Sequence, residues 1–261
     1  MPSADVNGQS FHYEDSGGPG PPVILGHGFL LDHTMFDPQV AALAPAFRVI
    51  RWDARGFGRT VYDGRPFTYW DAAADCIGIL DHLGIERAVV GGMSQGGYTA
   101  LRTALVYPDR VQALVLIGAD AAALSEQEKA NSRGMFATWE SMGPVNALIK
   151  PIAKMILGAP ERWEPWVSQW KAIAQGRLAE PARCLAERDD IAHRLPEITC
   201  PALVIHGTDD SSIPIEKAEI LARDLSGCAG LVQVAGAPHA SNLTHPEQVN
   251  AALLAFLRAC A

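Results

Sequence analysis

The stretch GGMSQGG, residues 91–97, decides the fold. It contains the pattern G-x-S-x-G, with Ser94 at its centre. The run before it, 87–92, is typical of a buried strand, and residues 95–107 after it have the pattern of a helix. A nucleophilic serine in a tight strand-to-helix turn needs small residues two positions before and after it, because the backbone is crowded there. The stretch predicts such a turn, although a glycine-rich turn with an ordinary surface serine explains the pattern alone equally well.

Short apolar runs alternate with helical patterns along the rest of the chain. Runs rich in Val, Ile and Leu without strict alternation predict strands that are buried on both faces of a parallel sheet. They cover residues 23–27, 47–53, 87–92, 111–119, 201–207 and 230–236, and helical patterns cover 70–84, 95–107, 216–226 and 246–259. We therefore predict an α/β fold with a mostly parallel, twisted sheet flanked by helices. The turn at 6–9 predicts an antiparallel hairpin at the sheet edge.

One long segment interrupts this alternation. Residues 121–195 hold no strand-like run, contain four of the six tryptophans, and have a helical pattern broken at 143–144 and 158–160. The simplest account is a helical cap, or lid, inserted between two strands. We therefore expect a core domain formed by 1–120 and 196–261, with the cap at 121–195.

Composition limits the classes of partner. The chain has 261 residues, 48% hydrophobic and 19% charged, which is ordinary for a globular protein. A formal net charge of -8 disfavours nucleic-acid binding, and we expect no membrane partner because no apolar run approaches the roughly 18 residues of a spanning helix. Five widely spaced cysteines without a CxxC pair predict free thiols rather than disulfides or a zinc site. With a polar N-terminus lacking a signal-peptide pattern, these features predict a cytoplasmic protein.

Two further loops supply an acid and a base to accompany Ser94. The loop 206–214 follows a predicted strand and offers Asp209 and Asp210, and His239 lies in the loop after the last predicted strand. Ligands bind at the carboxyl ends of the strands in open α/β sheets, so these loops should meet near Ser94. A serine, an acid and a histidine in this chain order form the Ser-His-Asp arrangement of one hydrolase class. Asp120, just after the strand at 111–119, is a rival acid.

An oxyanion hole needs two backbone N–H groups aimed at one point. One should come from Gln95, the residue after the nucleophile. The other should come from Phe29, in the loop His27-Gly28-Phe29 that follows the strand at 23–27.

At this point the chain resembles the α/β-hydrolase superfamily over nearly its whole length. The segment 53–59, DARGFGR, resembles the family's D-x-R-G-x-G segment, and 107–111 resembles the segment before the sixth strand. The acid loop resembles the pattern G-x-x-D, which places the acid at Asp210 rather than Asp209. The nearest group is the enol-lactonases and carboxylesterases, from which Gln95 departs. The resemblance implies an α/β-hydrolase fold and hydrolysis of a carboxylic ester, lactone or thioester, with no metal and no organic cofactor.

Several alternatives share the scaffold. Cofactor-free perhydrolases, C–C bond hydrolases and hydroxynitrile lyases keep the serine and histidine, and some members are non-catalytic small-molecule receptors. Haloalkane dehalogenases and epoxide hydrolases use an aspartate nucleophile, which Ser94 disfavours. A dinucleotide-dependent oxidoreductase is disfavoured because no G-x-G-x-x-G follows the first strand.

The cap should place apolar side chains over Ser94. Trp163, Trp166 and Trp170 recur at the spacing of one helix face, although such stripes more often belong to a core. The residues expected to line the substrate pocket are Leu30, Trp139, Trp163, Trp166 and Ile213. A pocket with few charges implies a small, largely apolar ester or lactone as the partner.

Overall fold

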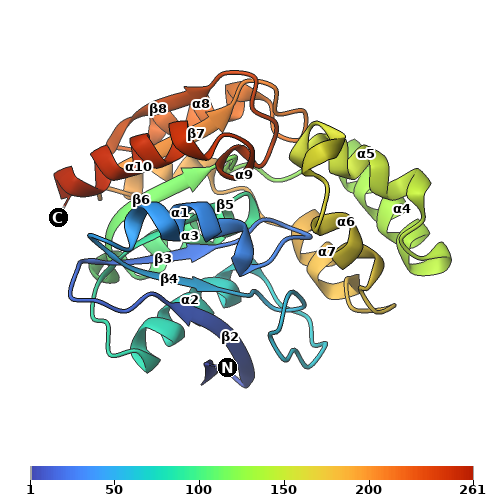
Figure 1. The fold of residues 1–261 in the computed structure, drawn as a ribbon, viewed down its shortest axis with the longest axis horizontal. Coiled ribbons are helices and arrows are strands. Elements are labelled where there is room, and N and C mark those ends of the chain that lie inside the picture. The colour runs from blue at the N-terminus through green and yellow to red at the C-terminus, as the bar shows by residue number, and fades with distance from the viewer. Residues whose placement is uncertain (1, 261) are drawn as a thin grey trace.

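The computed structural model describes residues 2–260 and arranges them around an eight-stranded sheet, shown in Figure 1. Its strand order is β1-β2-β4-β3-β5-β6-β7-β8. The strands are β1 (Ser3–Val6), β2 (Gln9–Asp15), β3 (Pro22–Gly26), β4 (Arg48–Trp52), β5 (Ala88–Met93), β6 (Val111–Ile117), β7 (Ala202–Gly207) and β8 (Cys228–Val234). The predicted edge hairpin is β1–β2, and β2 also pairs antiparallel with β4. The pairs from β4 through β8 are parallel.

Helices cover both faces of the sheet. On one face lie α2 (Tyr69–His82), α3 (Gln95–Val106) and α8 (Ile215–Asp224), and on the other lie α1 (Asp37–Leu43) and α10 (Pro246–Cys260). Each face of the sheet has its own apolar core, and successive residues of a strand point alternately into one core and the other. Ile24 packs in the first core, while Val23 and Leu25 pack in the second. Because both faces are buried, the strands read as the continuous apolar runs seen in the sequence.

Between β6 and β7 the chain forms a group of helices beside the sheet, on the right of Figure 1. They are α4 (Glu126–Met142), α5 (Asn146–Leu157), α6 (Trp166–Lys171) and α7 (Ala179–Ala186), with 3₁₀ turns η3 (Pro160–Arg162) and η4 (Ala192–Glu197). Gly143 and Gly158 end α4 and α5 with φ of 74° and 73°, a conformation that glycine adopts at low cost. The division into a core domain and a cap stays a prediction.

One predicted helix is shorter than its pattern suggested. The spacing of Trp163, Trp166 and Trp170 indicates a single helix, but α6 begins only at Trp166. Pro165 stands immediately before it and has no backbone N–H to donate, and it disfavours a helical conformation at the residue before it. Trp163 therefore closes the turn η3 instead.

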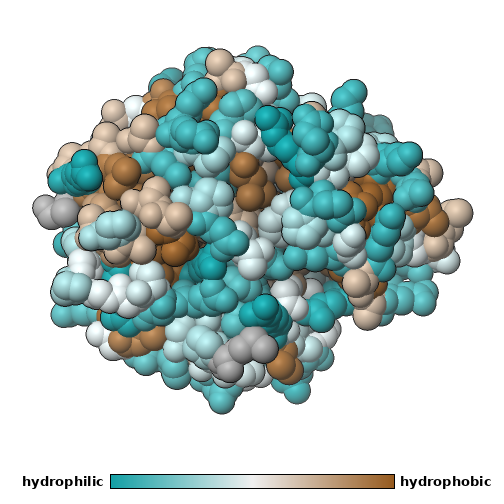
Figure 2. Space-filling view, in the orientation of Figure 1, coloured by the Kyte–Doolittle hydropathy of each residue, from teal (hydrophilic) through white to brown (hydrophobic). Residues whose placement is uncertain are grey.

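One face of the molecule is mostly polar. On the face shown in Figure 2, hydrophilic residues predominate and apolar ones form small separate groups. Within residues 2–260, no helix has both the length and the apolar character needed to cross a membrane.

Candidate active site

Ser94 lies in the turn between β5 and α3, in a strained backbone conformation. Its φ is 52° and its ψ is -114°, values that a residue with a Cβ atom adopts at a cost of roughly 1–3 kcal/mol. The turn is held from both sides: the N–H of Ser94 donates to the carbonyl of Ile117 at 2.8 Å, and its carbonyl accepts from the N–H of Tyr98 at 3.0 Å. The strain is thus maintained by the neighbouring strand and by the helix that follows.

The glycines of the stretch permit this turn. A Cβ atom at Gly96 would lie 1.9 Å from the carbonyl oxygen of Gly26, in β3. A Cβ atom at Gly92 would lie 2.5 Å from that same oxygen and from the carbonyl carbon of Gly96. These neighbours are backbone atoms that cannot rotate away, so only glycine lets the elbow sit against β3.

Asp210 and His239 lie directly after neighbouring strands β7 and β8. The Nδ1–H of His239 donates to Oδ2 of Asp210 at 2.7 Å. The other carboxylate oxygen accepts from the backbone N–H groups of Ser212 and Ile213, at 2.8 and 2.9 Å. Burial alone would raise the pKa of Asp210, but the charge of His239 and these hydrogen bonds outweigh it and hold the pKa below its usual value. Asp210 is therefore a carboxylate with its geometry fixed on both oxygens.

The loop that carries His239 is also attached to the helices between β6 and β7. The N–H of Ala240 donates to the carbonyl of Ile156 in α5 at 2.9 Å, and the N–H of His239 points to the carbonyl of Met155 at 3.4 Å. Gly118 lies next to His239 and Asp210: a Cβ atom at this position would lie 3.0 Å from the carbonyl oxygen of His239. The position of the His239 imidazole thus depends on the loop after β8 and on α5, to which that loop is hydrogen-bonded.

The loop after β3 is fixed by His27. Its Nε2 accepts from the N–H of Ala54 at 2.9 Å, so Nδ1 carries the proton and donates to the carbonyl of Gly28 at 2.8 Å. A Cβ at Gly28 would lie 2.3 Å from the sulfur of Met93, the residue before Ser94. The loop that carries Phe29 therefore packs closely against the turn that holds Ser94.

Ser94 and His239 line one cavity of about 190 Å³. Its remaining walls are mostly apolar and come from the loop after β3, from α3, from the segment between β6 and β7, and from the loop after β7. The described residues that line it are Phe29, Leu30, Ser94, Tyr98, Leu124, Ser132, Met135, Phe136, Ile152, Met155, Ile156, Leu185, Arg188, Ser212, Ile213 and His239. Since Nδ1 of His239 is bonded to Asp210, Nε2 is the nitrogen that can take a proton inside this cavity.

Known proteins share this architecture. A family model described as the alpha/beta hydrolase fold matches residues 21–142. A thermophilic esterase from Thermogutta terrifontis, solved with malate bound, is 31% identical, covers 99% of this chain and 98% of its own, and superposes with a TM-score of 0.88. The chain belongs to the alpha/beta hydrolase family.

Other relatives differ in activity. The enol-lactonase from Burkholderia xenovorans LB400 is 29% identical, covers 98% of this alpha/beta hydrolase and 100% of its own chain, and has a TM-score of 0.86. A bifunctional esterase/perhydrolase from Acinetobacter calcoaceticus is 29% identical over 97% of each chain. The predicted fold and family are confirmed, and the relatives span esterase, lactonase and perhydrolase types.

The tryptophans expected to line the pocket lie elsewhere in this alpha/beta hydrolase, so that expectation is corrected. Trp139 and Trp166 are buried in the apolar core shared with α5, and Trp163 donates its indole N–H to the carbonyl of Gly158 at 3.0 Å. Large indoles bury more area when they join two packed elements than when they face an open cavity. Among the described residues that line the cavity, Phe136 and the methionines Met135 and Met155 take the place of the indoles.

The other predicted pocket residues, Leu30 and Ile213, do line the cavity. Gln95 presents no side chain to it, because that side chain lines a separate, much smaller cavity next to His27. Its position as the first residue of α3 leaves its N–H outside the helical bonding pattern. The roles of Phe29 and Gln95 in an oxyanion hole stay a prediction.

Tyr98 and Arg188 are among the cavity residues that the sequence did not indicate. Tyr98 follows Ser94 by one helical turn, so the helical pattern places it next to Ser94. Its hydroxyl is in hydrogen-bonding contact with the Ser94 side chain, and burial raises its pKa, so the phenol stays neutral. Arg188 lies in the polar run 187–190, which reads as a solvated loop and carries no signal of burial.

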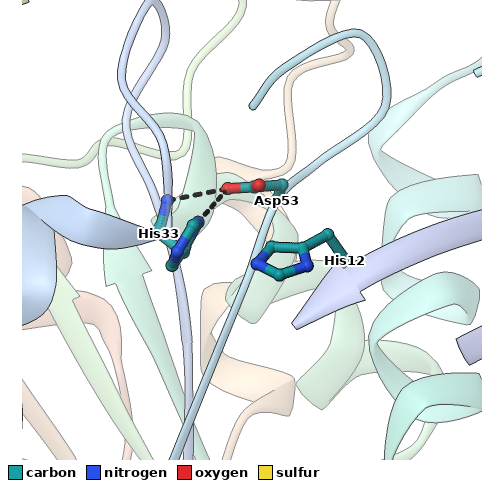
Figure 3. Close-up of side chains that lie close together, drawn as sticks. All are labelled: His12, His33 and Asp53. Carbon is teal, nitrogen blue, oxygen red and sulfur yellow. Dashed lines mark hydrogen bonds and ion pairs between the residues drawn. The ribbon is translucent and has the colours of Figure 1, made fainter. Parts of the chain in front are cut away.

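A second polar cluster lies at the carboxyl end of β4, where Asp53 meets His33 and His12 (Figure 3). His33 donates its N–H and its Nδ1–H to Oδ1 of Asp53, both at 2.8 Å, and Oδ2 accepts from the N–H of Arg59 at 2.8 Å. Burial would raise the pKa of Asp53, but the bonds and charge of His33 and the charge of His27 lower it to about 2. Ligand atoms of His12, His33 and Asp53 lie within 4.8 Å of one another, as in a metal site, yet both Asp53 oxygens already accept hydrogen bonds. We interpret the cluster as a buried ion pair that fixes the loop after β4.

Proposed function

We propose that this alpha/beta hydrolase is a serine esterase or lactonase that cleaves a small, largely apolar substrate through an acyl-enzyme on Ser94. The observation that carries the proposal is the 2.7 Å bond from His239 to Asp210, in the wall of the cavity that Ser94 also lines. The relatives named above support hydrolysis of esters or lactones over a non-catalytic role.

The proposed reaction has two halves. Oγ of Ser94 bonds to the substrate carbonyl carbon while Nε2 of His239 takes the hydroxyl proton. The oxyanion that forms is stabilised by the N–H groups of Phe29 and Gln95. Collapse breaks the ester C–O bond, and His239 gives its proton to the leaving oxygen. In the second half, a water molecule gives a proton to His239 and attacks the acyl carbon, and the bond to Oγ of Ser94 breaks. This step releases the acid, and His239 returns the proton to Ser94. Asp210 keeps the imidazole in the required tautomer and stabilises its charged form.

The test is turnover of an ester and lactone panel by the wild type and by Ser94→Ala. We expect loss of a triad member to lower turnover by on the order of 10⁶-fold. Ser168→Ala is the matched control, because that serine is exposed on α6 and should keep wild-type rates. Undiminished hydrolysis by a clean Ser94→Ala preparation would overturn the serine mechanism.

A second candidate, perhydrolysis on the same residues, is favoured by the bifunctional esterase/perhydrolase relative. In that reaction hydrogen peroxide replaces water as the group that attacks the acyl-enzyme. Peracid formation from a short carboxylic acid and hydrogen peroxide, at a rate above that of ester hydrolysis, would favour this candidate.

A further inference from the structure

The wall of the active-site cavity contains one fixed cation. Among the described residues that line it, Arg188 is the only arginine or lysine, and its side chain is only 5% exposed. The neighbouring walls are apolar, from side chains such as Leu124 and Leu185. A buried charge costs free energy unless it is paired, so its presence in an apolar cavity needs an explanation.

The surrounding chain holds the guanidinium of Arg188 in one place. Its Nε donates to the carbonyl of Ala122 at 3.1 Å, and its Nη1 donates to the carbonyl of Leu185 at 3.1 Å. Its Cζ lies over the ring of Tyr98, 4.6 Å from the ring centroid, which is a cation–π contact. The group is therefore already ordered before any ligand arrives, which lowers the entropic cost of binding one.

The ion pair between Arg188 and Asp120 neutralises the guanidinium charge only weakly. Nη2 meets Oδ1 of Asp120 at 3.3 Å, longer than the 2.7–2.9 Å or so of a strong charge-assisted bond, and the contact is single rather than bidentate. Asp120 is absent from the described lining of the cavity, so it lies behind the guanidinium. Burial raises the pKa of Asp120 despite the nearby charge of Arg188, which further weakens it as a partner.

Arg188 keeps unused hydrogen-bonding capacity in the wall of the cavity. A guanidinium has five N–H donors, and the bonds to Ala122, Leu185 and Asp120 engage three of them among the described residues. One donor remains on each terminal nitrogen. Two such donors in one plane match the two oxygens of a carboxylate.

Tyr98 lies between Ser94 and Arg188 in the wall of the cavity. Its hydroxyl contacts Ser94, and its ring carries Arg188, so one tyrosine side chain separates the nucleophile from the cation. An acyl chain bonded to Ser94 would pass along this ring and end at the guanidinium.

We propose that Arg188 binds a carboxylate at the far end of the acyl group, so that the preferred substrates are monoesters of small dicarboxylic acids. This rests on the proposed function of the same site and specifies the acyl group that it takes. The chain between carbonyl and carboxylate packs against the apolar walls, and the carboxylate is recognised by charge and by hydrogen bonds.

The test compares esters that differ only in the terminal group. The monoethyl esters of succinic, glutaric and adipic acid are paired with ethyl esters of equal length that end in methyl. A hydrogen-bonded charge predicts that the best monoester exceeds its neutral partner in kcat/KM by about tenfold or more. Arg188→Met combined with Asp120→Asn removes both charges together, so no lone carboxylate is left buried, and should lower that ratio at least tenfold.

The control variant is Arg133→Met, which removes a 60% exposed arginine from α4 and should keep the wild-type ratio. A wild type that prefers the neutral partner at every length, or a double variant that folds and keeps the preference, overturns the inference. If the wild type hydrolyses neither ester class, the proposed function fails instead. In that case, calorimetry with the monomethylamide of glutaric acid tests the inference independently of turnover. Binding to the wild type that is lost in the double variant supports the inference, and no binding to the wild type overturns it.

Discussion

Replacement of Asp210 by asparagine tests whether this carboxylate has a catalytic role or only a structural one. The Oδ1 of Asp210 accepts two backbone N–H groups, from Ser212 and Ile213. An asparagine carbonyl can accept the same two, so the loop should keep its shape. The amide nitrogen would then face Nδ1 of His239, where the carboxylate oxygen now accepts at 2.7 Å. Two donors cannot bond, so the imidazole must move its proton to Nε2 and can no longer act as a base towards Ser94.

The size of the effect distinguishes the two roles. Loss of the correct tautomer costs about 10⁴ in kcat in a Ser-His-Asp triad, which is about 5 kcal/mol of barrier. Loss of an ordinary hydrogen bond to a charged group costs about 1.5–3 kcal/mol, or roughly 10- to 150-fold. We therefore expect Asp210→Asn to lower kcat by more than about a thousandfold.

The assay is steady-state hydrolysis of an activated aryl ester, with the melting temperature measured alongside. Asp209→Asn is the matched control, since that carboxylate is exposed one residue earlier and should keep kcat within about twofold. Near-normal turnover by Asp210→Asn, together with a collapse in Asp120→Asn, would show that the rival acid after β6 serves His239.

Two further predictions concern stability. Gly96→Ala should lower the free energy of unfolding by about 1–3 kcal/mol or more, because its Cβ would lie 1.9 Å from the carbonyl oxygen of Gly26. Gly134→Ala is the control and should be neutral or stabilising, because the space around Gly134 on α4 is open. Equal urea midpoints for the two variants would contradict this prediction. Asp53, with its pKa lowered from 3.8 to about 2, should contribute about 2 kcal/mol above pH 4 that is lost as the pH falls towards 2. His33, with its pKa raised above 6.5, contributes stability below pH 6.5 that is lost as the pH rises through its folded value. An unfolding free energy that stays level from about pH 2 to 9 would refute both assignments.

The sequence predicted the fold well because local signals agree with the global arrangement. The elbow at Ser94, the acid three residues after Gly207 and the histidine after the last strand each lie at the carboxyl end of a strand. Parallel strands bring those ends to one edge of the sheet, so chain order alone brings Ser94, Asp210 and His239 together. Their catalytic roles remain a proposal.

The cavity wall could not be predicted in the same way. Helical spacing shows that a side chain is buried, but not whether it faces a cavity or a core. Trp170 illustrates this, since its indole is fully buried and donates to the carbonyl of Leu30 at 2.6 Å, 140 residues away in the chain. Arg188 shows the converse. It stands in a run of charged residues, and it is buried by contacts that include the distant Tyr98 and Asp120.

The proposed mechanism requires that Ser94 becomes covalently modified during the reaction. The most direct measurement is fluorophosphonate labelling of the purified protein, followed by digestion and mass spectrometry of the modified peptide. We expect a single phosphonyl adduct on Ser94 that blocks ester hydrolysis in proportion to labelling, and no adduct in Ser94→Ala. An adduct at another serine, or full ester hydrolysis by protein whose Ser94 is completely labelled, would contradict it.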